Sequence, residues 1–140
     1  MSDCIFCNII NKEIPGKIIY EDAICIAFLD RSQTTKGHTL VVPKKHYQNF
    51  LEVDRETLQH MTMITQRLAQ QITNNLQATG CNILTNVGLS AGQTVLHFHL
   101  HIIPRYDETD TITLSFSDNS QHFRIDEIYQ IIKKGLDTTD

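Results

Sequence analysis

The sequence predicts a single α+β domain built on a five-stranded antiparallel sheet with two to three helices. Three observations lead to this class. The 140 residues are enough for one domain with a buried core. Short runs of β-branched and aromatic residues alternate with turn residues over much of the chain. One long segment instead repeats its apolar residues at helical spacing. Because short turns join neighbouring strands, we expect antiparallel pairing.

The N-terminal elements are a short helix and a pair of strands. Residues 4–11 carry apolar side chains at helical spacing, which predicts a helix. Pro15-Gly16 forms a turn after it. Residues 17–20 and 23–29 are rich in β-branched and aromatic residues, so they predict two strands joined by a turn at Glu21-Asp22.

The middle of the chain holds one strand and the longest helix. Residues 30–37 are polar and predict a loop, and Pro43 stops the strand expected over 38–42. Residues 54–77 predict a helix with Asp54 as its N-cap. One face of that helix collects the side chains that we expect to reach the core: Leu58, Met61, Thr65, Leu68, Ile72 and Leu76.

Two more strands and a final helix complete the prediction. The strands are expected over 81–85 and 95–103, and a short amphipathic helix over 123–136. Gly80 ends the connection before the first of these strands, and Pro104 ends the second. Residues 107–121 are polar and predict irregular structure.

Composition excludes several classes of function. The formal net charge of −4 disfavours binding to a nucleic-acid backbone, although a small phosphorylated ligand remains compatible with it. Neither a secretory signal nor a membrane span is expected, since the N-terminal residues have no basic segment and no long apolar run. Without an export signal, the four cysteines are expected to be reduced thiols or metal ligands, in the cytoplasm.

The strongest chemical signal is a row of alternating histidines. Alternation along a strand places His97, His99 and His101 on one face. The opposite face points into the core and carries Leu96, Phe98, Leu100 and Ile102. Removing imidazoles from water on an apolar strand costs free energy unless they have hydrogen-bond partners or a function. We therefore expect this strand to line an active site. His60 and His122 are expected to be ordinary surface or core residues.

Two chemistries compete for the histidine row. Alternate strand histidines can converge on a metal ion, or one neutral imidazole can act as a nucleophile while another donates a proton. No carboxylate stands in the strand or in the loop before it, which weakens a metal site at the central histidine. That loop, residues 86–94, is rich in glycine, hydroxyl and amide groups that can approach an anion. Together these features indicate a phosphorus centre beside an imidazole.

The same residues resemble the signature of the histidine triad (HIT) superfamily of nucleotide hydrolases and transferases. The likeness joins Asn86-x-Gly88, the run 91–95 and the triad run 97–105. Upstream blocks of the family match in order at Cys4-Ile5-Phe6-Cys7, Ala27-Phe28-Leu29-Asp30, and the run 37–44. The resemblance implies one HIT-like domain over 1–140, with a core over about 4–105 and a variable tail over 106–140.

The resemblance also implies a mechanism. His99 would attack the α-phosphorus of a nucleotide and form a nucleotidyl-histidine that water hydrolyses. A neutral imidazole, with a reference pKa of about 6.5, is a usable nucleophile near neutral pH if its other nitrogen is tied up as a donor. His101 would contact the phosphate and stabilise or protonate the leaving group, while Gln93 and Thr94 hold phosphoryl oxygens or the leaving atom. No catalytic metal is implied. The substrate would be a nucleoside phosphoramidate or a dinucleoside polyphosphate.

Other positions of the family pattern receive supporting roles. His38 would fix ring tautomers by a hydrogen bond, and Asp30 would accept from the ribose hydroxyls. Asn86 is a further candidate for nucleotide binding. Three apolar side chains would form the slot for the base: Phe6, Ile9 and Phe28. For each of these three, ordinary core packing is an equally good interpretation.

The Cys4-x-x-Cys7 pair indicates zinc if two more ligands exist, because thioredoxin-type chemistry requires this motif after a strand. In many bacterial relatives of the resembled family, zinc is completed by two histidines, which here are His46 and His97. That site would be structural, and two unligated thiols are the alternative. Cys25 and Cys81 lie in apolar strand patterns and are expected to be small core residues.

Two other functions remain open beside the hydrolase. The first is a nucleotide-binding or sensing module with little catalysis, and the second is a histidine–metal enzyme. The resemblance also implies a homodimer whose sheet extends across a two-fold axis. Neither nucleic acid nor a membrane is expected as a partner.

Overall fold

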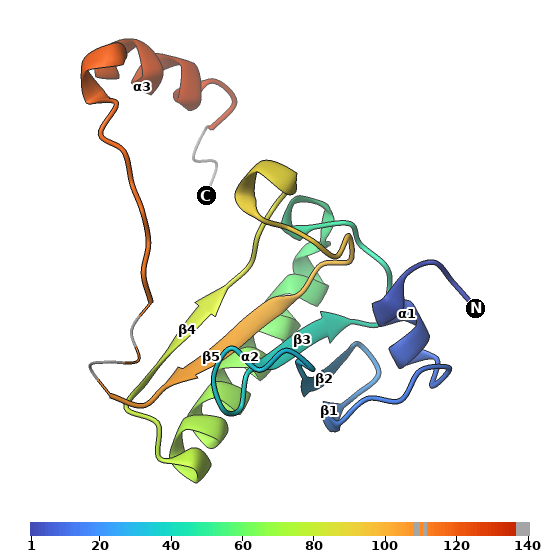
Figure 1. Cartoon of the computed structure of the whole chain (residues 1–140). Helices are drawn as coiled ribbons and strands as arrows, with labels where there is room; N and C mark the ends of the chain where they lie inside the picture. Colours follow the sequence, from blue (N-terminus) through green and yellow to red (C-terminus); the bar gives the residue numbers. More distant parts are fainter. Residues whose placement is uncertain (108–109, 111, 137–140) are drawn as a thin grey trace.

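The computed structural model describes residues 1–107, 110 and 112–136. Its body is one five-stranded antiparallel sheet, as the sequence predicted, and the strands lie in the spatial order β1-β2-β3-β5-β4 (Figure 1). The strands are β1 Ile18–Glu21, β2 Cys25–Leu29, β3 Thr39–Pro43, β4 Gly80–Leu84 and β5 Leu100–Arg105. The α-helices are α1 Ile5–Ile10, α2 Arg55–Leu76 and α3 Ile125–Lys133. Three 3₁₀ turns are η1 Phe50–Glu52, η2 Leu89–Ala91 and η3 Ser120–His122.

The sheet is packed on both faces. On one face, α2 covers a core that includes Met61, Phe98 and Ile102. On the other face, α1 contributes Phe6 and Ile9 to a second buried cluster. The two helices therefore lie on opposite faces of the sheet. The histidine row faces α1, because Phe6 of that helix contacts the rings of His97 and His99.

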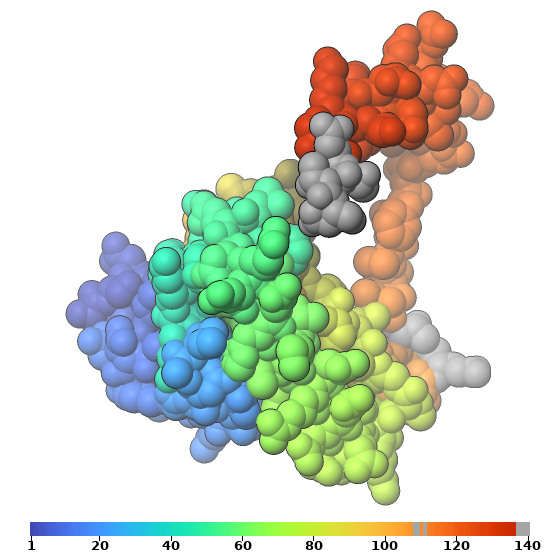
Figure 2. Space-filling view, turned by 180° about the vertical axis from the view of Figure 1, so that it is seen from behind, coloured from blue at the N-terminus to red at the C-terminus, as the bar shows by residue number. Residues whose placement is uncertain are grey.

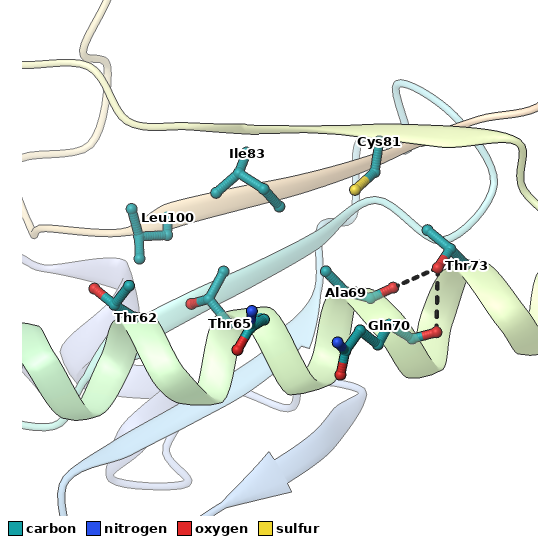
Figure 3. Close-up of a pocket in the computed structure, with 9 residues that line it drawn as sticks. Thr62, Thr65, Ala69, Gln70, Thr73, Cys81, Ile83 and Leu100 are labelled. Atoms are coloured by element: carbon teal, nitrogen blue, oxygen red, sulfur yellow. Dashed lines mark hydrogen bonds between the residues drawn. The ribbon is translucent and has the colours of Figure 1, made fainter.

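Helix α2 begins and ends as its sequence dictates. The Asp54 carboxylate accepts a hydrogen bond from the Thr57 amide at 2.8 Å, which confirms the predicted N-cap. At the other end, Gln77 takes the left-handed conformation with φ of 58°, and the chain turns there into β4. A groove of about 430 Å³ opens between α2 and strands β4 and β5 (Figure 3).

The predicted fifth strand differs from β5 at both ends. Residues 95–99 are not paired in the sheet, because their backbone groups bond elsewhere: the Phe98 amide donates to the Tyr47 carbonyl at 2.7 Å, and the Thr85 hydroxyl donates to the His99 carbonyl at 2.7 Å. Leu96 is 46% exposed, so its expected place in the core is wrong. Pro104 lies inside β5 opposite Cys81 and does not end the strand.

The C-terminal segment leaves the body of the molecule. Residues 112–119 have no helix or strand, as predicted, and they lead to α3, which is shorter than the predicted 123–136 (Figures 1 and 2). None of the helices in the described parts of the chain is both long and apolar enough to cross a membrane.

Candidate active site and metal centre

His99 is held in the tautomer that a nucleophile needs. Its Nδ1 lies 2.7 Å from the His97 carbonyl oxygen, so Nδ1 carries the proton and donates it there. Nε2 is then a bare lone pair, and among the described residues it has no hydrogen-bond partner. Burial lowers the pKa of this ring, which favours the neutral form. The acceptor that ties up this nitrogen is therefore the backbone carbonyl two residues earlier.

His101 is oriented by a chain of donors. The Thr34 amide donates to Nδ1 of His38 at 3.3 Å, so the proton of His38 resides on Nε2. That Nε2 lies 2.9 Å from Nδ1 of His101 and donates to it. Neutral His101 must then carry its proton on Nε2. Burial lowers the pKa of His101 to about 4, so the ring is neutral near pH 7.

The rings of His99 and His101 are neighbours, with centroids 4.8 Å apart and planes inclined at 61°. One ring offers a bare Nε2 and the other a protonated Nε2. Asp30 lies beside this pair, with Oδ2 3.7 Å from Nε2 of His38 and Oδ1 accepting from the Ser32 amide at 2.8 Å. The arrangement combines a nucleophile with an adjacent proton donor.

The expected base-slot residues are largely core residues in this structure. Phe6, Ile9 and Phe28 are 6%, 6% and 3% exposed and belong to the cluster under α1. Phe6 also packs edge-on against the rings of His97 and His99, at 5.9 and 5.0 Å between centroids. The Phe6 side chain therefore packs against these two histidine rings and helps to fix their orientation.

Gln93 holds the loop over residues 86–94. Its Nε2 donates to the carbonyls of Gln48 at 2.7 Å and Val95 at 3.0 Å, and its Oε1 accepts from the Gly88 amide at 2.9 Å. Both amide donors are engaged, so Gln93 positions the loop and, in this conformation, has no donor left for a phosphate. Gly88 and Gly92 have φ of 81° and 92°, which L side chains rarely adopt, so the loop needs glycine at both.

The other two candidate residues of this loop make fewer side-chain hydrogen bonds than Gln93. Thr94 is exposed, so its hydroxyl is available to a ligand. Asn86 is half-buried, and its Nδ2 lies 3.5 Å from the Gly92 carbonyl oxygen, at the limit of a hydrogen bond.

The structure brings Cys4, Cys7, His46 and His97 together, with their ligand atoms within 4.8 Å of one another. Nδ1 of His97 lies 3.3 and 3.5 Å from the sulfurs of Cys4 and Cys7 and 3.0 Å from Nδ1 of His46. Tetrahedral zinc with bonds of about 2.0–2.3 Å requires ligand separations of about 3.3–3.8 Å. The two distances to sulfur fall in that range and the His46–His97 distance lies just below it, so the four residues fit zinc.

The position of the proton on His97 also favours metal binding by this cluster. Nε2 of fully buried His97 donates to the Pro43 carbonyl at 2.9 Å, which leaves Nδ1 bare and facing the other three ligand atoms. Burial raises the pKa of the Cys7 thiol to about 11, with Cys4 adding to the effect. A cation that binds there would supply the charge that a thiolate needs. Cys4 is also the N-cap of α1, so the cluster fixes this helix.

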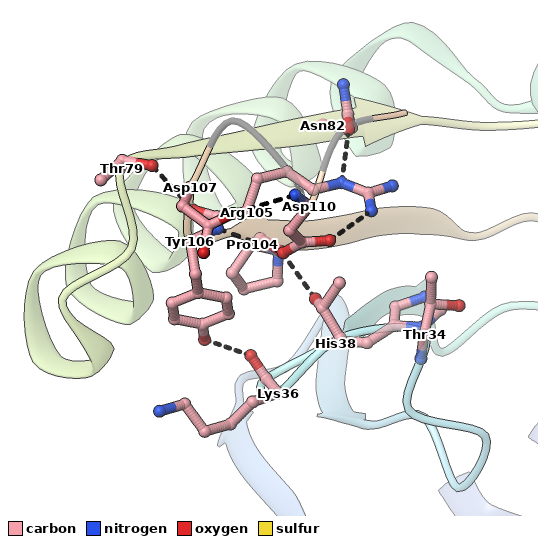
Figure 4. A network of polar contacts seen from close by, with 11 residues as sticks. Thr34, Lys36, His38, Thr79, Asn82, Pro104, Arg105, Tyr106, Asp107 and Asp110 are labelled. Atoms are coloured by element: carbon pink, nitrogen blue, oxygen red, sulfur yellow. Dashed lines mark hydrogen bonds and ion pairs between the residues drawn. The ribbon is translucent and has the colours of Figure 1, made fainter. Parts of the chain in front are cut away.

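The contacts that hold the loop orienting His38 leave no pattern in the sequence. The Thr35 hydroxyl donates to the Pro104 carbonyl at 2.6 Å, and the Tyr106 hydroxyl donates to the Lys36 carbonyl (Figure 4). Arg105 donates from Nε to Asn82 at 2.9 Å and pairs with Asp110 at 3.1 Å (Figure 4). The contacts of Thr35 and Tyr106 join loop 30–38 to the end of β5, and those of Arg105 hold that end to β4 and to Asp110. The first two pair residues 69 and 70 positions apart, so local sequence patterns do not predict them.

A second polar cluster lies outside the site. Asp22 accepts from the amides of Ile24 and Cys25 at 2.7 and 2.8 Å, from the Tyr20 hydroxyl at 2.7 Å, and from Nε2 of His60 at 2.6 Å. Both carboxylate oxygens are thus occupied by protein donors. The cluster joins the β1–β2 turn to α2, and His60 is the satisfied histidine that the sequence predicted.

Three kinds of comparison relate this chain to known proteins. The family model described as "HIT domain" matches residues 11–108. A solved member of the HIT family from Bacillus subtilis is 38% identical, covers 99% of this chain and 100% of its own, and superposes with a TM-score of 0.87. A Zn-bound histidine triad family protein from Mycobacterium smegmatis is 37% identical over 85% of this chain and 86% of its own, with a TM-score of 0.75. An adenylylsulfatase of Arabidopsis thaliana is 34% identical over 90% of this chain and 64% of its own length.

Proposed function

The chain belongs to the HIT family, and from this premise we propose that it hydrolyses a nucleotide at the α-phosphorus through a nucleotidyl-histidine on His99. The observation that carries the proposal is the bare Nε2 of His99, held in place by the bond from its Nδ1 to the His97 carbonyl. A neutral imidazole with one free lone pair is the species that attacks phosphorus.

The first step forms one bond and breaks one. Nε2 of His99 attacks the α-phosphorus, and the bond from phosphorus to the leaving nitrogen or oxygen breaks with its electron pair. His101 gives the leaving atom its Nε2 proton, and a solvent water returns a proton to Nε2, so the ring stays neutral while its Nδ1 keeps accepting from His38. In the second step the hydroxide formed from that water attacks the phosphorus, and the N–P bond breaks to restore neutral His99.

The substrate class that we propose is a nucleoside phosphoramidate or a dinucleoside polyphosphate. The Arabidopsis relative is named as an adenylylsulfatase, and cleavage at an adenylyl phosphorus is the feature these substrates share. We assign the ribose hydroxyls to Asp30, and the phosphate oxygens to Thr94, Asn86 and His101. The base would lie against the apolar cluster of Phe6, Ile9 and Phe28.

We further propose that Cys4, Cys7, His46 and His97 hold a structural zinc ion, and that the reaction uses no catalytic metal. All four ligand positions would be filled by protein, and bound zinc would supply structural stability. The Zn-bound relative and the fit of the four donors support this proposal. A cytoplasmic location is consistent with reduced cysteine ligands. We also propose a homodimer whose sheet continues across a two-fold axis.

The test compares His99→Ala with the wild type on adenosine phosphoramidates and diadenosine polyphosphates. We expect loss of turnover in the variant and, in the wild type, an adenylylated His99 peptide trapped by mass spectrometry. His122→Ala, a change at an exposed histidine outside the site, is the matched control and should keep full activity.

The same experiment separates the enzyme from a nucleotide sensor. His99→Asn and His99→Gly should still bind nucleotide, measured by calorimetry, while they fail to turn it over. Unchanged turnover in His99→Ala would end the proposal. Nucleotide binding by the wild type with no product in any substrate of the panel would favour the sensing module.

A further inference from the structure

The nucleophilic histidine lies in a short stretch that precedes the paired part of β5. This stretch, residues 97–99, is held by contacts with other parts of the chain. The ring of His97 donates from Nε2 to the Pro43 carbonyl at 2.9 Å. The Phe98 amide donates to the Tyr47 carbonyl at 2.7 Å. Both contacts come from the segment that follows β3, and neither of them reaches the third residue of the stretch.

The third residue is held from the other side by Thr85. The Thr85 hydroxyl donates to the His99 carbonyl oxygen at 2.7 Å. The register of β4 and β5 ends at the pair Leu84 and His101, and Thr85 is the first residue beyond β4. Its hydroxyl therefore extends the link between the two segments past the end of their ladder. Valine has the same branched shape and would fit this half-buried position, but it has no donor.

The bond from Thr85 acts on the orientation of the His99 ring. On one side of the residue, Nδ1 of the ring donates to the His97 carbonyl at 2.7 Å and so fixes the tautomer. On the other side, the Thr85 hydroxyl restrains the peptide group that follows His99. The ring is attached to the Cα atom between these two points. Release of the second point would let that atom shift and would loosen the bond at Nδ1.

Thr85 also stands at the root of the loop over residues 86–94. We have assigned phosphate oxygens to Asn86 and Thr94 of this loop, so one hydroxyl joins the start of the phosphate site to the nucleophile. A displacement reaction requires the reacting atoms to lie about 3–3.5 Å apart, and an error of about 1 Å costs much of the rate. The distance between the loop and Nε2 of His99 is therefore a quantity that the reaction depends on.

We propose that Thr85 is a positioning residue: its hydroxyl holds the main chain of His99 so that Nε2 faces the α-phosphorus. The inference rests on the proposed function and adds to it a residue that touches neither the substrate nor the reacting atoms. A hydroxyl that served packing alone would affect stability and leave the ring of His99 unchanged. The tests separate these two roles.

The first test compares Thr85→Val with Thr85→Ser in the full-length protein. We expect kcat on an adenosine phosphoramidate to fall roughly tenfold in Thr85→Val, the scale of one neutral hydrogen bond, with KM nearly unchanged. Thr85→Ser keeps the hydroxyl and should recover most of the loss. Equal losses in the two variants, or full activity in Thr85→Val, would overturn the proposal.

The control makes the same change at the opposite end of the same pair of strands. The Thr79 hydroxyl, which directly precedes β4, donates to the Arg105 carbonyl at 3.3 Å. Thr79→Val therefore also removes a hydroxyl that links the β4 and β5 segments, but far from the histidines along the strands. We expect its kcat and KM to equal those of the wild type. A tenfold loss in Thr79→Val as well would assign the effect to the pairing of the strands and not to Thr85.

A second measurement does not depend on turnover. The ¹⁵N chemical shifts of the His99 ring at pH 7 report which nitrogen carries the proton. We expect the two shifts to lie far apart in the wild type, Thr85→Ser and Thr79→Val, and to move toward each other in Thr85→Val as the proton distributes over both nitrogens. Identical shifts in the wild type and Thr85→Val would overturn the role of Thr85. A wild type that turned over no substrate would end the proposed function, while these shifts would still decide the role of Thr85.

Discussion

His38 touches no substrate in the proposed reaction, yet it decides where the proton of His101 resides. Without the donor bond to Nδ1, His101 can hold its single proton on either nitrogen, and only Nε2–H can serve the leaving group. The sequence placed His38 beside the triad through resemblance. The direction of the donor chain could not be read there, because it depends on the Thr34 amide.

For His38→Ala we therefore expect kcat to fall by about a hundredfold, a typical contribution of a general acid, with a smaller change in KM. His38→Gln keeps an N–H donor near Nδ1 of His101 and should recover part of the loss. Steady-state kinetics of both variants checks this. A loss of equal size in both, together with a lowered thermal midpoint, would point to a packing defect and against tautomer control.

Gln93 makes contacts in the structure that its residue type alone does not predict. Its place in the loop before the histidines follows from the sequence, and the amide type suggested a bond to phosphate. In the structure, three backbone groups from Gln48, Gly88 and Val95 use the whole side chain. Two of these lie close in sequence, but Gln48 is 45 positions away, and only the fold brings it near.

At the scale of elements, the predictions were best where the apolar pattern matches the burial. Helix α2 follows from its one buried face, and the strands β2 and β3, which are buried on both faces, follow from their continuous apolar runs. Residues 95–99 carried an equally clear alternation but do not pair in the sheet. Their backbone groups bond to Tyr47 and Thr85, and such long-range partners leave no mark on local periodicity.

The Asp22 cluster is the contact that ties the β1–β2 turn to α2, and it makes stability depend on pH. Burial raises the pKa of Asp22, but the hydrogen bonds from Tyr20, Cys25, His60 and Ile24 outweigh it and hold the pKa well below its usual range. A depressed folded-state pKa gives stability that is present above the unfolded pKa of about 4 and is lost as the pH falls below it.

For Asp22→Asn we expect a loss of about 2 kcal/mol in the free energy of unfolding at pH 7, the scale of hydrogen bonds to a charged group. The variant should also lose less stability than the wild type between pH 5 and pH 3. Urea unfolding at several pH values measures both. Parallel pH curves for the two proteins would show that Asp22 does not set this dependence.

Over the whole molecule, the two faces of the sheet carry different kinds of residues. The face under α1 carries the histidines and the cysteine pair, and the face under α2 carries the neutral groove at the β4 edge. The sequence predicted the first face through its motifs. The groove on the second face was not predicted, because the residues that line it form no sequence motif and come together only in the folded chain.

The proposed zinc site would link the stability of the whole molecule to its chemistry. His97 offers Nδ1 to the cluster, and its carbonyl holds the proton of His99, so one residue serves both sites. Cys4 and Cys7 tie α1 to the same point. Zinc that binds only the folded chain stabilises it by about 4 kcal/mol at a free concentration a thousandfold above its dissociation constant.

Removal of zinc by a chelator should therefore lower the thermal midpoint and the activity together, and added zinc should restore both. Cys4→Ser should behave like the chelated protein, while Cys81→Ser, a thiol outside the cluster, should bind zinc normally. Metal analysis, calorimetry and turnover on the same samples check this. If activity vanished while the thermal midpoint stayed unchanged, the ion would belong to the reaction, and the nucleophilic role of His99 would have to be replaced by metal catalysis.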